Sequence, residues 1–455
     1  MDNINNRNDL DITKIMENQP IINIGVIGHV SNGKSTVVKA ITGISTQKRS
    51  DEKIRNITKR LGYANAKIYK CNSCSAPECY QSTSSSEKDH KCKICGQISQ
   101  LITHVSFTDC PGHNQFMTTM LNGTCIMDYS ILVESASNTM IPAQQTIEHY
   151  KITKEANVET QFVCLNKIDL IPKSKALEII EKMRSFLKLD NTTIPIIPVS
   201  GTLELNIDIL CQYLTNLKTP EKNLTSDFKM LIVRSFNVNS GITEMNQLKG
   251  GVVGGSLVCG IVKVDQNVVI YPGFINKKQN KDKDDSAIWT YKPLRCKVFS
   301  IHSEKNELQF AIQGGLIGIQ LDLDPAMTAD DKLIGQIMFK EYMKNDNEED
   351  NDNEEDNDKK LESIKVFEGI IIEYKKIFDT SYKIKKNDIV QINVNSNNIK
   401  CTVFKIKDNL CLKLDKPVCV EIGDFVSINI INDLDSIKLY AYGTIIDGLS
   451  SKLDI

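Results

Sequence analysis

Between residues 21 and 222, short apolar runs alternate with longer amphipathic stretches. The runs have the length of buried strands, and they cover 21–27, 102–108, 129–134, 161–165 and 194–199. The stretches between them have the spacing of helices, and they cover 114–122, 142–156, 174–187 and 205–216. This alternation predicts an α/β domain, in which helices wrap a mostly parallel sheet. Ligands bind such sheets at the carboxyl ends of the strands.

From residue 225 onwards, short apolar runs separated by glycine turns replace the helical spacing. These runs are Met230–Phe236, Gly250–Gly255, Leu257–Val264, Asn267–Tyr271, Leu294–Ile301 and Gly314–Leu321. The pattern predicts an all-β domain, a small barrel, with loops at 276–286 and at Trp289. Residues 364–446 repeat the strand-and-turn pattern, which predicts a second barrel.

The expected organisation is a flexible N-terminus, an α/β domain, a first barrel, an acidic loop and a second barrel. The corresponding ranges are 1–20, 21–222, 225–343, 344–362 and 363–455. Residues 345–358 contain only Asp, Glu and Asn, so the acidic loop is expected to be disordered. A solvated linker is favoured there over a segment that mimics nucleic acid.

The composition of the 455-residue chain, with 41% hydrophobic and 25% charged residues, is that of a globular protein. The formal net charge of −2 excludes a globally basic surface, so nucleic-acid binding would need a local patch. No apolar run approaches the ~20 residues of a membrane-spanning helix, and Met1–Arg7 lacks the apolar core of a signal peptide. Fourteen scattered cysteines indicate reduced thiols. We therefore expect a cytoplasmic protein without a membrane partner.

The first apolar run leads into a glycine loop with the spelling G-x-x-x-x-G-K-S, from Gly28 to Ser35. Between a strand and a helix, this spelling indicates a phosphate-binding loop, and an ordinary glycine turn is the alternative. Backbone N–H groups and the helix dipole attract the anion, Lys34 reaches the β- and γ-phosphates, and Ser35 ligates Mg²⁺. The predicted nucleotide-binding residues of this loop are Ser31, Asn32, Gly33, Lys34, Ser35 and Thr36.

Two further segments carry candidate ligands of Mg²⁺ and the γ-phosphate. In Asp109-Cys110-Pro111-Gly112-His113, Asp109 can hold Mg²⁺ through water, and Gly112 can offer its N–H group to the γ-phosphate. On its own this segment is equally typical of a strand-to-turn boundary. Thr58 lies in a segment that is either a charged helix, over 51–61, or a nucleotide switch. In a switch, Thr58 would ligate Mg²⁺ only while the γ-phosphate is present.

Candidates for base recognition follow the next strands. In Asn166-Lys167-Ile168-Asp169, the Asp169 carboxylate can accept hydrogen bonds from both the N1–H and the exocyclic amine of guanine. Adenine lacks this pair of donors, so the segment favours guanine. Lys167 can lie over the base or brace the loop. The segment Ser200-Gly201-Thr202 is expected to place backbone N–H groups near the base.

The cysteine pairs Cys71-x₂-Cys74 and Cys92-x₂-Cys95 are separated by seventeen residues. Two such pairs provide four thiolates for a structural zinc site, which leaves no open position for catalysis. We expect a zinc knuckle over 71–95, with Cys79 as a spare or alternative ligand. The run Ser82–Ser86 between the pairs is expected to be a loop.

Taken together, these residues resemble the gamma-subunit family of eukaryotic and archaeal translation initiation factor 2, within the elongation factor Tu-like translational GTPases. The stretches that carry the resemblance are Leu61–Cys71, His104–Phe107, Arg234–Phe236, Lys249–Val252 and Gly314–Gly318. The first of these and the cysteine pairs separate this family from the elongation factors. The resemblance implies an α/β P-loop GTPase domain with a zinc-knuckle insertion, followed by two all-β barrel domains.

The resemblance also implies a function. Such a protein binds methionyl initiator tRNA, delivers it to the small ribosomal subunit, and uses GTP hydrolysis as the release switch. The implied cofactors are GTP or GDP, Mg²⁺ and structural Zn²⁺. The implied partners are an alpha subunit on the second barrel, a beta subunit on the GTPase domain, a GTPase-activating factor and a nucleotide-exchange factor.

Three residues take roles from the resemblance alone. The position of His113 orients the attacking water, which suits an imidazole near the γ-phosphate. The position of Asn56 influences the switch, and that of Tyr63 lies near the methionine and the tRNA end. We expect slow hydrolysis without a partner, since an arginine supplied by a partner adds roughly 10³–10⁵-fold in related GTPases.

The chain departs from the family pattern at four places. It has Ser31-Asn32 where Asp-His or Ala-His is usual, Asn114 where an acidic residue is usual, and Ser200-Gly201 where Ser-Ala is usual. The family's last barrel ends in a basic segment, whereas Ile430–Ile455 holds two lysines and four aspartates. Phosphate contacts dominate nucleic-acid affinity, so a GTP-binding assembly scaffold with weakened tRNA binding stays open as an alternative. A separate alternative is another GTPase that carries aminoacyl-tRNA, against which Gly62-Tyr63-Ala64 and the cysteine pairs count.

Overall fold

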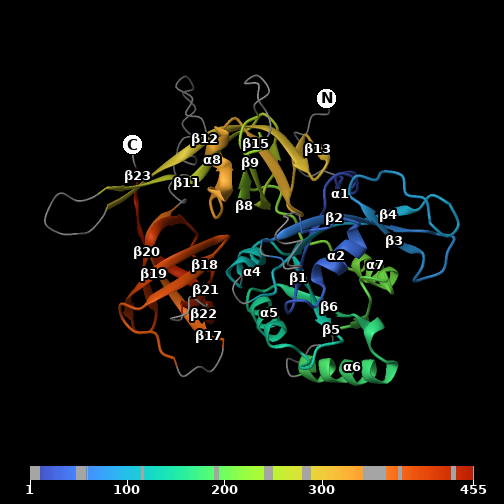
Figure 1. Cartoon of the computed structure of the whole chain (residues 1–455). Coiled ribbons are helices and arrows are strands. Elements are labelled where there is room, and N and C mark those ends of the chain that lie inside the picture. Colours follow the sequence, from blue (N-terminus) through green and yellow to red (C-terminus); the bar gives the residue numbers. More distant parts are fainter. Residues whose placement is uncertain are drawn as a thin grey trace. The chain divides into compact units, whose positions relative to one another are not determined.

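The computed structural model describes residues 11–47, 58, 60–113, 117–188, 194–239, 249–278, 288–341, 365–377, 382–431 and 437–453. The expectations for Asn56, Asn114 and the acidic run 345–358 lie outside the described residues. The chain divides into two compact units (Figure 1). They are Met1–Thr225 with His302–Ile317, and Ser226–Ile301 with Gly318–Ile455.

The first unit is built on a seven-stranded sheet with the strand order β3-β2-β4-β1-β5-β6-β7. The strands are β1 (Ile22–Ile27), β2 (Gly62–Lys70), β3 (Tyr80–Ser84), β4 (Gln100–Asp109), β5 (Tyr129–Ser135), β6 (Glu159–Asn166) and β7 (Ile196–Pro198). Parallel pairing joins β4, β1, β5, β6 and β7, whereas β2 pairs antiparallel with β4 and β3. The mostly parallel sheet predicted from the sequence is therefore confirmed.

Helices cover this sheet. They are α1 (Ile12–Met16), α2 (Lys34–Thr42), α4 (Met117–Thr124), α5 (Gln144–Glu155), α6 (Lys173–Lys188), α7 (Ile207–Thr215) and the 3₁₀ helix η2 (Ile168–Leu170). Helix α7 buries Ile207, Leu210, Cys211 and Leu214, one apolar stripe at helical spacing. This stripe packs in the same core as the central strands. Among the described residues, no helix combines the length and apolar character needed to cross a membrane.

Part of the N-terminal stretch that was expected to be flexible packs on the first unit. Residues 12–16 form α1, in which Ile15 and Met16 are buried. The Gln19 side chain donates to the Ile312 carbonyl at 2.7 Å. The short strands β13 (Asn306–Leu308) and β14 (Phe310–Ala311) lie in this neighbouring segment.

Strand β2 was not predicted, because polar residues interrupt its pattern. Asn65 and Lys67 are both buried. Their partners are distant in sequence: Asn65 donates to Ser303 at 3.3 Å, and Lys67 donates to the Glu87 carbonyl at 2.6 Å. Buried polar groups with such partners are stable in a strand, but an apolar pattern cannot reveal them.

The loop expected over Ser82–Ser86 is partly wrong, because β3 extends to Ser84 and pairs with β2. An edge strand is held by backbone hydrogen bonds, so a serine-rich run can form one. The loop expected at Trp289 is also wrong. Trp289 lies in β12, opposite Lys277 of β11, and the Lys277 ammonium lies 5.3 Å from its ring centroid.

The second unit contains the two β regions. The first comprises β8 (Lys229–Phe236), β9 (Val252–Cys259), β10 (Val262–Lys263), β11 (Asn267–Lys278), β12 (Ile288–Ser303), β15 (Ile317–Leu321) and β16 (Ile337–Lys340), with α8 (Pro325–Thr328) and η4 (Ala329–Asp331). Its pairing order, β11-β16-β8-β9-β15-β12, returns to its start because β11 also pairs with β12.

The second β region is a closed barrel with the order β17-β20-β19-β18-β21-β22. Its strands are β17 (Val366–Lys376), β18 (Ile389–Val394), β19 (Asn397–Ile406), β20 (Leu410–Cys419), β21 (Phe425–Ile431) and β22 (Ile437–Ser450). A short strand, β23 (Lys452–Leu453), pairs with β12. Buried and exposed residues alternate along β19, as a barrel wall requires. The fold class is thus confirmed, while the ranges 21–222, 225–343 and 363–455 stay predictions.

Candidate functional site

The glycine loop joins β1 to α2 and leaves the first turn of α2 without a side-chain cap. Gly33 is the N-cap residue, at φ 87°, and makes no capping hydrogen bond. A side chain at Gly33 would overlap the Asn166 amide as well as being strained at this φ. The free N–H groups of a helix start favour an anion, so this geometry suits phosphate.

Lys34 is buried beneath this loop. Its ammonium donates to the carbonyls of Gly28 and His29, both at 2.9 Å. Burial lowers the pKa of Lys34 to about 8, and the nearby Asp109 carboxylate opposes this shift. A phosphate beside the ammonium would favour its charged form further.

The segment that follows β4 lies against the glycine loop. A side-chain carbon at Gly112 would overlap the Lys34 ammonium and the Val30 nitrogen. Asp109 ends β4 in register with Val26 of β1 and is buried. The structure therefore brings together two motifs that are 78 positions apart, counted from Lys34 to Gly112.

The hydroxyl groups of two candidate Mg²⁺ ligands are adjacent. Ser35 Oγ lies 3.0 Å from Thr58 Oγ1. Neighbouring ligands of an octahedral Mg²⁺, each at 2.0–2.1 Å, lie about 2.9 Å apart, so these hydroxyls fit the ion. The third candidate, Asp109, accepts a hydrogen bond from Thr46 at 2.6 Å, and its hard oxygens also suit Mg²⁺.

Asn166 connects the glycine loop to the base-recognition segment. Its side-chain amide donates to the Asn32 carbonyl at 2.9 Å and accepts from the Gly201 N–H group at 3.0 Å. Gly201 packs against α2, since a side-chain carbon there would lie 3.2 Å from the Thr36 and Val37 backbone. Asn166 thus braces the two loops through both ends of its amide.

The remaining predicted residues lie around these loops. Ser200 is buried and Thr202 is exposed. Lys167 has φ 61° and is the N-cap residue of η2, which carries the exposed Asp169. His113 is half-buried beyond Gly112. Tyr63 lies in β2, opposite Thr108 of β4.

Polar side chains of α5 accept hydrogen bonds from the backbone of the glycine loop. These side chains were not predicted as part of the site. The N–H groups of Gly28, His29 and Val30 donate to His149, Thr146 and Gln145 at 3.2, 3.2 and 3.3 Å. Burial lowers the pKa of His149 to about 3, so the ring is neutral and its Nδ1 accepts. These three residues occupy the buried stripe of α5. The sequence does contain a signal for them, because they are polar residues at helix positions where buried apolar residues are expected.

Glu134 and Asn32 complete this buried network. Glu134 lies next to the last residue of β5 and accepts from Thr146 and Asn138, both at 2.5 Å. Asn32 donates to the Val133 carbonyl at 2.8 Å and accepts from Asn138 at 3.0 Å. Burial raises the pKa of Glu134. Both ends of the Asn32 side-chain amide are thus engaged within the protein.

The four predicted zinc ligands form one cluster. The sulfur atoms of Cys71, Cys74, Cys92 and Cys95 all lie within 4.8 Å of one another. The Cys71–Cys95 separation is 3.4 Å and the Cys74–Cys92 separation is 3.8 Å. Zn–S bonds of ~2.3 Å in a tetrahedron place sulfur atoms about 3.8 Å apart, so the cluster is consistent with a structural zinc.

Two details of the cluster refine the prediction. Cys79 is buried but does not belong to the four; its carbonyl accepts from the Cys71 N–H group at 2.9 Å. The backbone N–H groups of Cys95 and Ile94 lower the pKa of Cys92 to about 6, which favours the thiolate that binds metal.

Two family models match parts of the chain. Residues 19–220 match the elongation factor Tu GTP binding domain, and residues 361–431 match the C-terminal domain of initiation factor eIF2 gamma. Eukaryotic translation initiation factor 2 subunit gamma of Encephalitozoon cuniculi is 39% identical over 92% of this chain and 91% of its own. The Schizosaccharomyces pombe protein of the same name is 37% identical over 91% of each chain.

Solved structures share the fold. The bacterial selenocysteine-specific elongation factor EF-Sec has a TM-score of 0.64 and 20% identity, over 93% of this chain and 58% of its own. Elongation factor SelB of Methanococcus maripaludis with the GTP analogue GppNHp has a TM-score of 0.64 and 19% identity, over 94% of this chain and 79% of its own. The two initiation-factor subunits have a much higher sequence identity to this chain than these two elongation factors have. The chain therefore belongs to the family of the gamma subunit of eukaryotic translation initiation factor 2, the translation-initiation GTPases, which use GTP, GDP and Mg²⁺.

Proposed function

We propose that this GTPase carries methionyl initiator tRNA to the small ribosomal subunit and releases it on GTP hydrolysis. The observation that supports this most is the convergence of three distant motifs in a chain of this family. Gly112 lies against Lys34, Asn166 joins Asn32 to Gly201, and Ser35 lies beside Thr58. Together they form a site suited to guanine nucleotide and Mg²⁺.

The proposed roles follow from the chemistry of the residues in these motifs. Lys34 binds the β- and γ-phosphates, and the Gly112 N–H group binds the γ-phosphate. Asp169 accepts hydrogen bonds from guanine, and His113 orients the attacking water. Ser35, Thr58 and Asp109 hold Mg²⁺, which neutralises the charge that develops on the phosphates.

The switch is proposed to act through Thr58. Its hydroxyl lies 3.0 Å from Ser35, so both can share one ion. Loss of the γ-phosphate weakens the hold of the ion on Thr58 and releases the segment that contains it. That segment leads into β2, which carries Tyr63, the residue proposed to lie near the tRNA end. Asn56 is proposed to influence the same movement.

The partners are proposed by analogy with the subunit names of the relatives. An alpha and a beta subunit complete a heterotrimer, and a GTPase-activating factor and an exchange factor drive the cycle. The site of action is the cytoplasm. Whether the last barrel contributes to tRNA binding depends on basic residues other than Lys438 and Lys452, which are outnumbered by aspartates over 430–455.

The test is a filter-binding assay with the full chain, its partner subunits and GTP. Methionyl initiator tRNA is compared with methionyl elongator tRNA. The proposal predicts much tighter binding of the initiator tRNA. Equal binding of both would favour a general carrier of aminoacyl-tRNA, and absence of binding to either would favour an assembly scaffold.

A further inference from the structure

A glutamine beside the cysteine cluster contacts the segment that carries its second cysteine pair. Gln81 lies in β3, between the first and second cysteine pairs in sequence. Its Nε2 donates to Cys92 Sγ at 3.4 Å and to the Glu78 carbonyl at 3.3 Å. Its Oε1 accepts from the Lys93 N–H group at 3.0 Å and lies 3.0 Å from His90 Nε2.

These four contacts fix the orientation of the Gln81 amide. A flipped amide would turn its oxygen toward the Cys92 sulfur and its NH₂ group toward the Lys93 N–H group. Both contacts would then be unfavourable, because a thiolate only accepts and a backbone N–H group only donates. The amide therefore presents an N–H donor to the sulfur. For the same reason His90 Nε2 is the donor in its contact with the amide oxygen.

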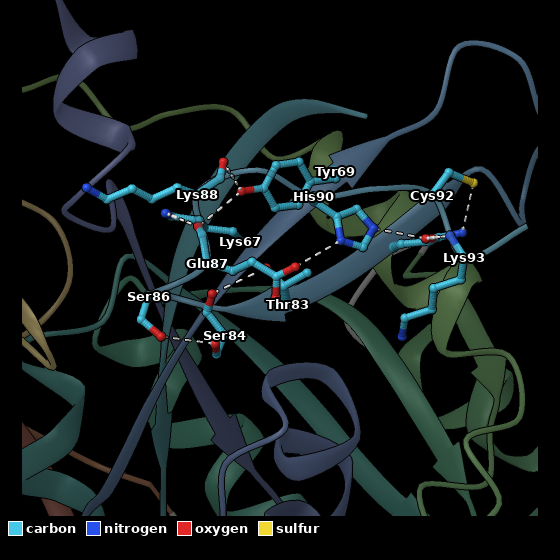
Figure 2. A network of polar contacts seen from close by, with 11 residues as sticks. Lys67, Tyr69, Thr83, Ser84, Ser86, Glu87, Lys88, His90, Cys92 and Lys93 are labelled. Atoms are coloured by element: carbon cyan, nitrogen blue, oxygen red, sulfur yellow. Dashed lines mark hydrogen bonds and ion pairs between the residues drawn. The ribbon is translucent and has the colours of Figure 1, made fainter. Parts of the chain in front are cut away.

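His90 is itself held in place (Figure 2). It is 3% exposed, and its ring packs on Tyr69 of β2 with centroids 4.9 Å apart. The Tyr69 hydroxyl donates to the Glu87 carbonyl at 3.3 Å, and the Lys67 ammonium donates to the same oxygen at 2.6 Å. The segment before the second cysteine pair is thus fastened to the sheet.

This arrangement matters because the cysteines come from two separate segments. Cys71 and Cys74 follow β2, whereas Cys92 and Cys95 follow the segment that carries His90. Cys92 receives hydrogen bonds from Gln81 and from the Ile94 N–H group, at 3.4 and 3.5 Å. Donors to a ligating sulfur stabilise its charge, and a held ligand loses less freedom when the metal binds.

We propose that Gln81, oriented by His90, is a positioning residue of the zinc site. It holds the second cysteine pair on β3, next to the β2–β3 connection that carries the first pair, before the metal binds. It also donates a hydrogen bond to Cys92 Sγ. Both effects raise the affinity for zinc. The proposal concerns the metal alone and is independent of tRNA binding.

The experiment measures the zinc affinity of the full chain by competition with a chromogenic chelator. Gln81→Met removes the amide at nearly constant volume, and outer-shell changes of this kind cost 10–100-fold in affinity. We expect a loss of about tenfold or more. Gln81→Glu keeps the acceptor for Lys93 but turns an oxygen toward Cys92, so we expect a larger loss. The control Gln100→Met changes an exposed glutamine on β4, and its affinity should equal that of the wild type.

A purely structural role makes a different prediction. Both Gln81 variants would then unfold at a lower temperature, while the folded proteins would bind zinc as the wild type does, and that result would overturn the proposal. GDP binding reports whether the variants are folded. If neither folds, His90→Phe keeps a ring on Tyr69 and removes the donor to Gln81. His90→Phe should lower the zinc affinity, as is expected for the Gln81 variants, and an unchanged affinity would contradict the proposal.

Discussion

At the scale of single residues, the motifs proposed to bind nucleotide are hydrogen-bonded to one another. Sequence spacing identified Asn166 as a base-recognition residue, but the structure shows that its amide joins Asn32 to Gly201. Such bonds cross 134 and 35 positions of the chain and leave no periodic signal. The role of Asn166 at the base stays a prediction from its motif, whereas its partners could not be predicted from the sequence.

Base selectivity is predicted to depend on the Asp169 carboxylate. Asp169→Asn replaces one acceptor oxygen by an NH₂ donor, which faces the exocyclic amine of guanine. Loss of a hydrogen bond to a charged group costs about 1.5–3 kcal/mol, so the GTP affinity should fall by about 10–100-fold. Xanthosine triphosphate carries a carbonyl at that position and should bind the variant better than the wild type. Fluorescence titration measures both, and unchanged GTP affinity would refute the role of Asp169.

His149 is predicted to make the GTPase domain sensitive to acid. Burial lowers its pKa to about 3, while an unfolded histidine has a pKa of about 6.5. Between these values the unfolded chain binds more protons, so the free energy of unfolding falls as the pH drops below 6.5. The contribution of one such group is at most about 1.4 kcal/mol per pH unit.

His149→Asn offers Gly28 an acceptor that does not titrate. From pH 6.5 to 5, the wild type should therefore lose more stability than this variant in denaturant unfolding. His104, whose pKa burial also lowers to about 3, is present in both proteins and cancels in the comparison. Identical pH dependence of the two proteins would show that His149 is not the titrating group.

At the scale of elements, apolar strands and amphipathic helices were predictable, α5 among them, whereas the polar contacts that stabilise β2 and the buried stripe of α5 were not. The run at 129–134 became β5, whose seven residues are nearly all buried. In contrast, β2 and the buried stripe of α5 depend on polar side chains whose partners lie elsewhere in the fold. The local sequence shows the apolar pattern of an element, but it does not show which distant residues its polar side chains contact.

The zinc knuckle is predicted to depend on its metal. Its buried cluster comprises Cys71, Cys79 and Cys92, with Cys74 and Tyr80 packed against it, which is too small a core to be stable alone. Removal of zinc by a chelator should accelerate hydrogen exchange over 71–95 and leave β1 and α2 protected. Mass spectrometry of peptides from each region measures this. Unchanged exchange over 71–95 would show that the knuckle is stable without metal.

At the scale of the whole molecule, the two β regions of the second unit form one body. Ser396 donates to the Ile232 carbonyl at 2.7 Å, and Asn397 donates to the Gly335 carbonyl at 2.5 Å. Lys229 forms an ion pair with Glu421 at 2.9 Å. These contacts explain why the chain divides into two units, although the sequence predicts three folded domains. A nucleotide switch in the first unit can act on tRNA only if tRNA binds its two states with different affinity.

The most direct test compares the affinity of methionyl initiator tRNA for the GppNHp-bound and GDP-bound protein, with its partner subunits present. We predict tighter binding with GppNHp, by about 5–150-fold, as is typical of coupled sites. Thr58→Val, which removes the hydroxyl beside Ser35, should bring the ratio toward one. Equal affinity of the wild type in both states would contradict the switch.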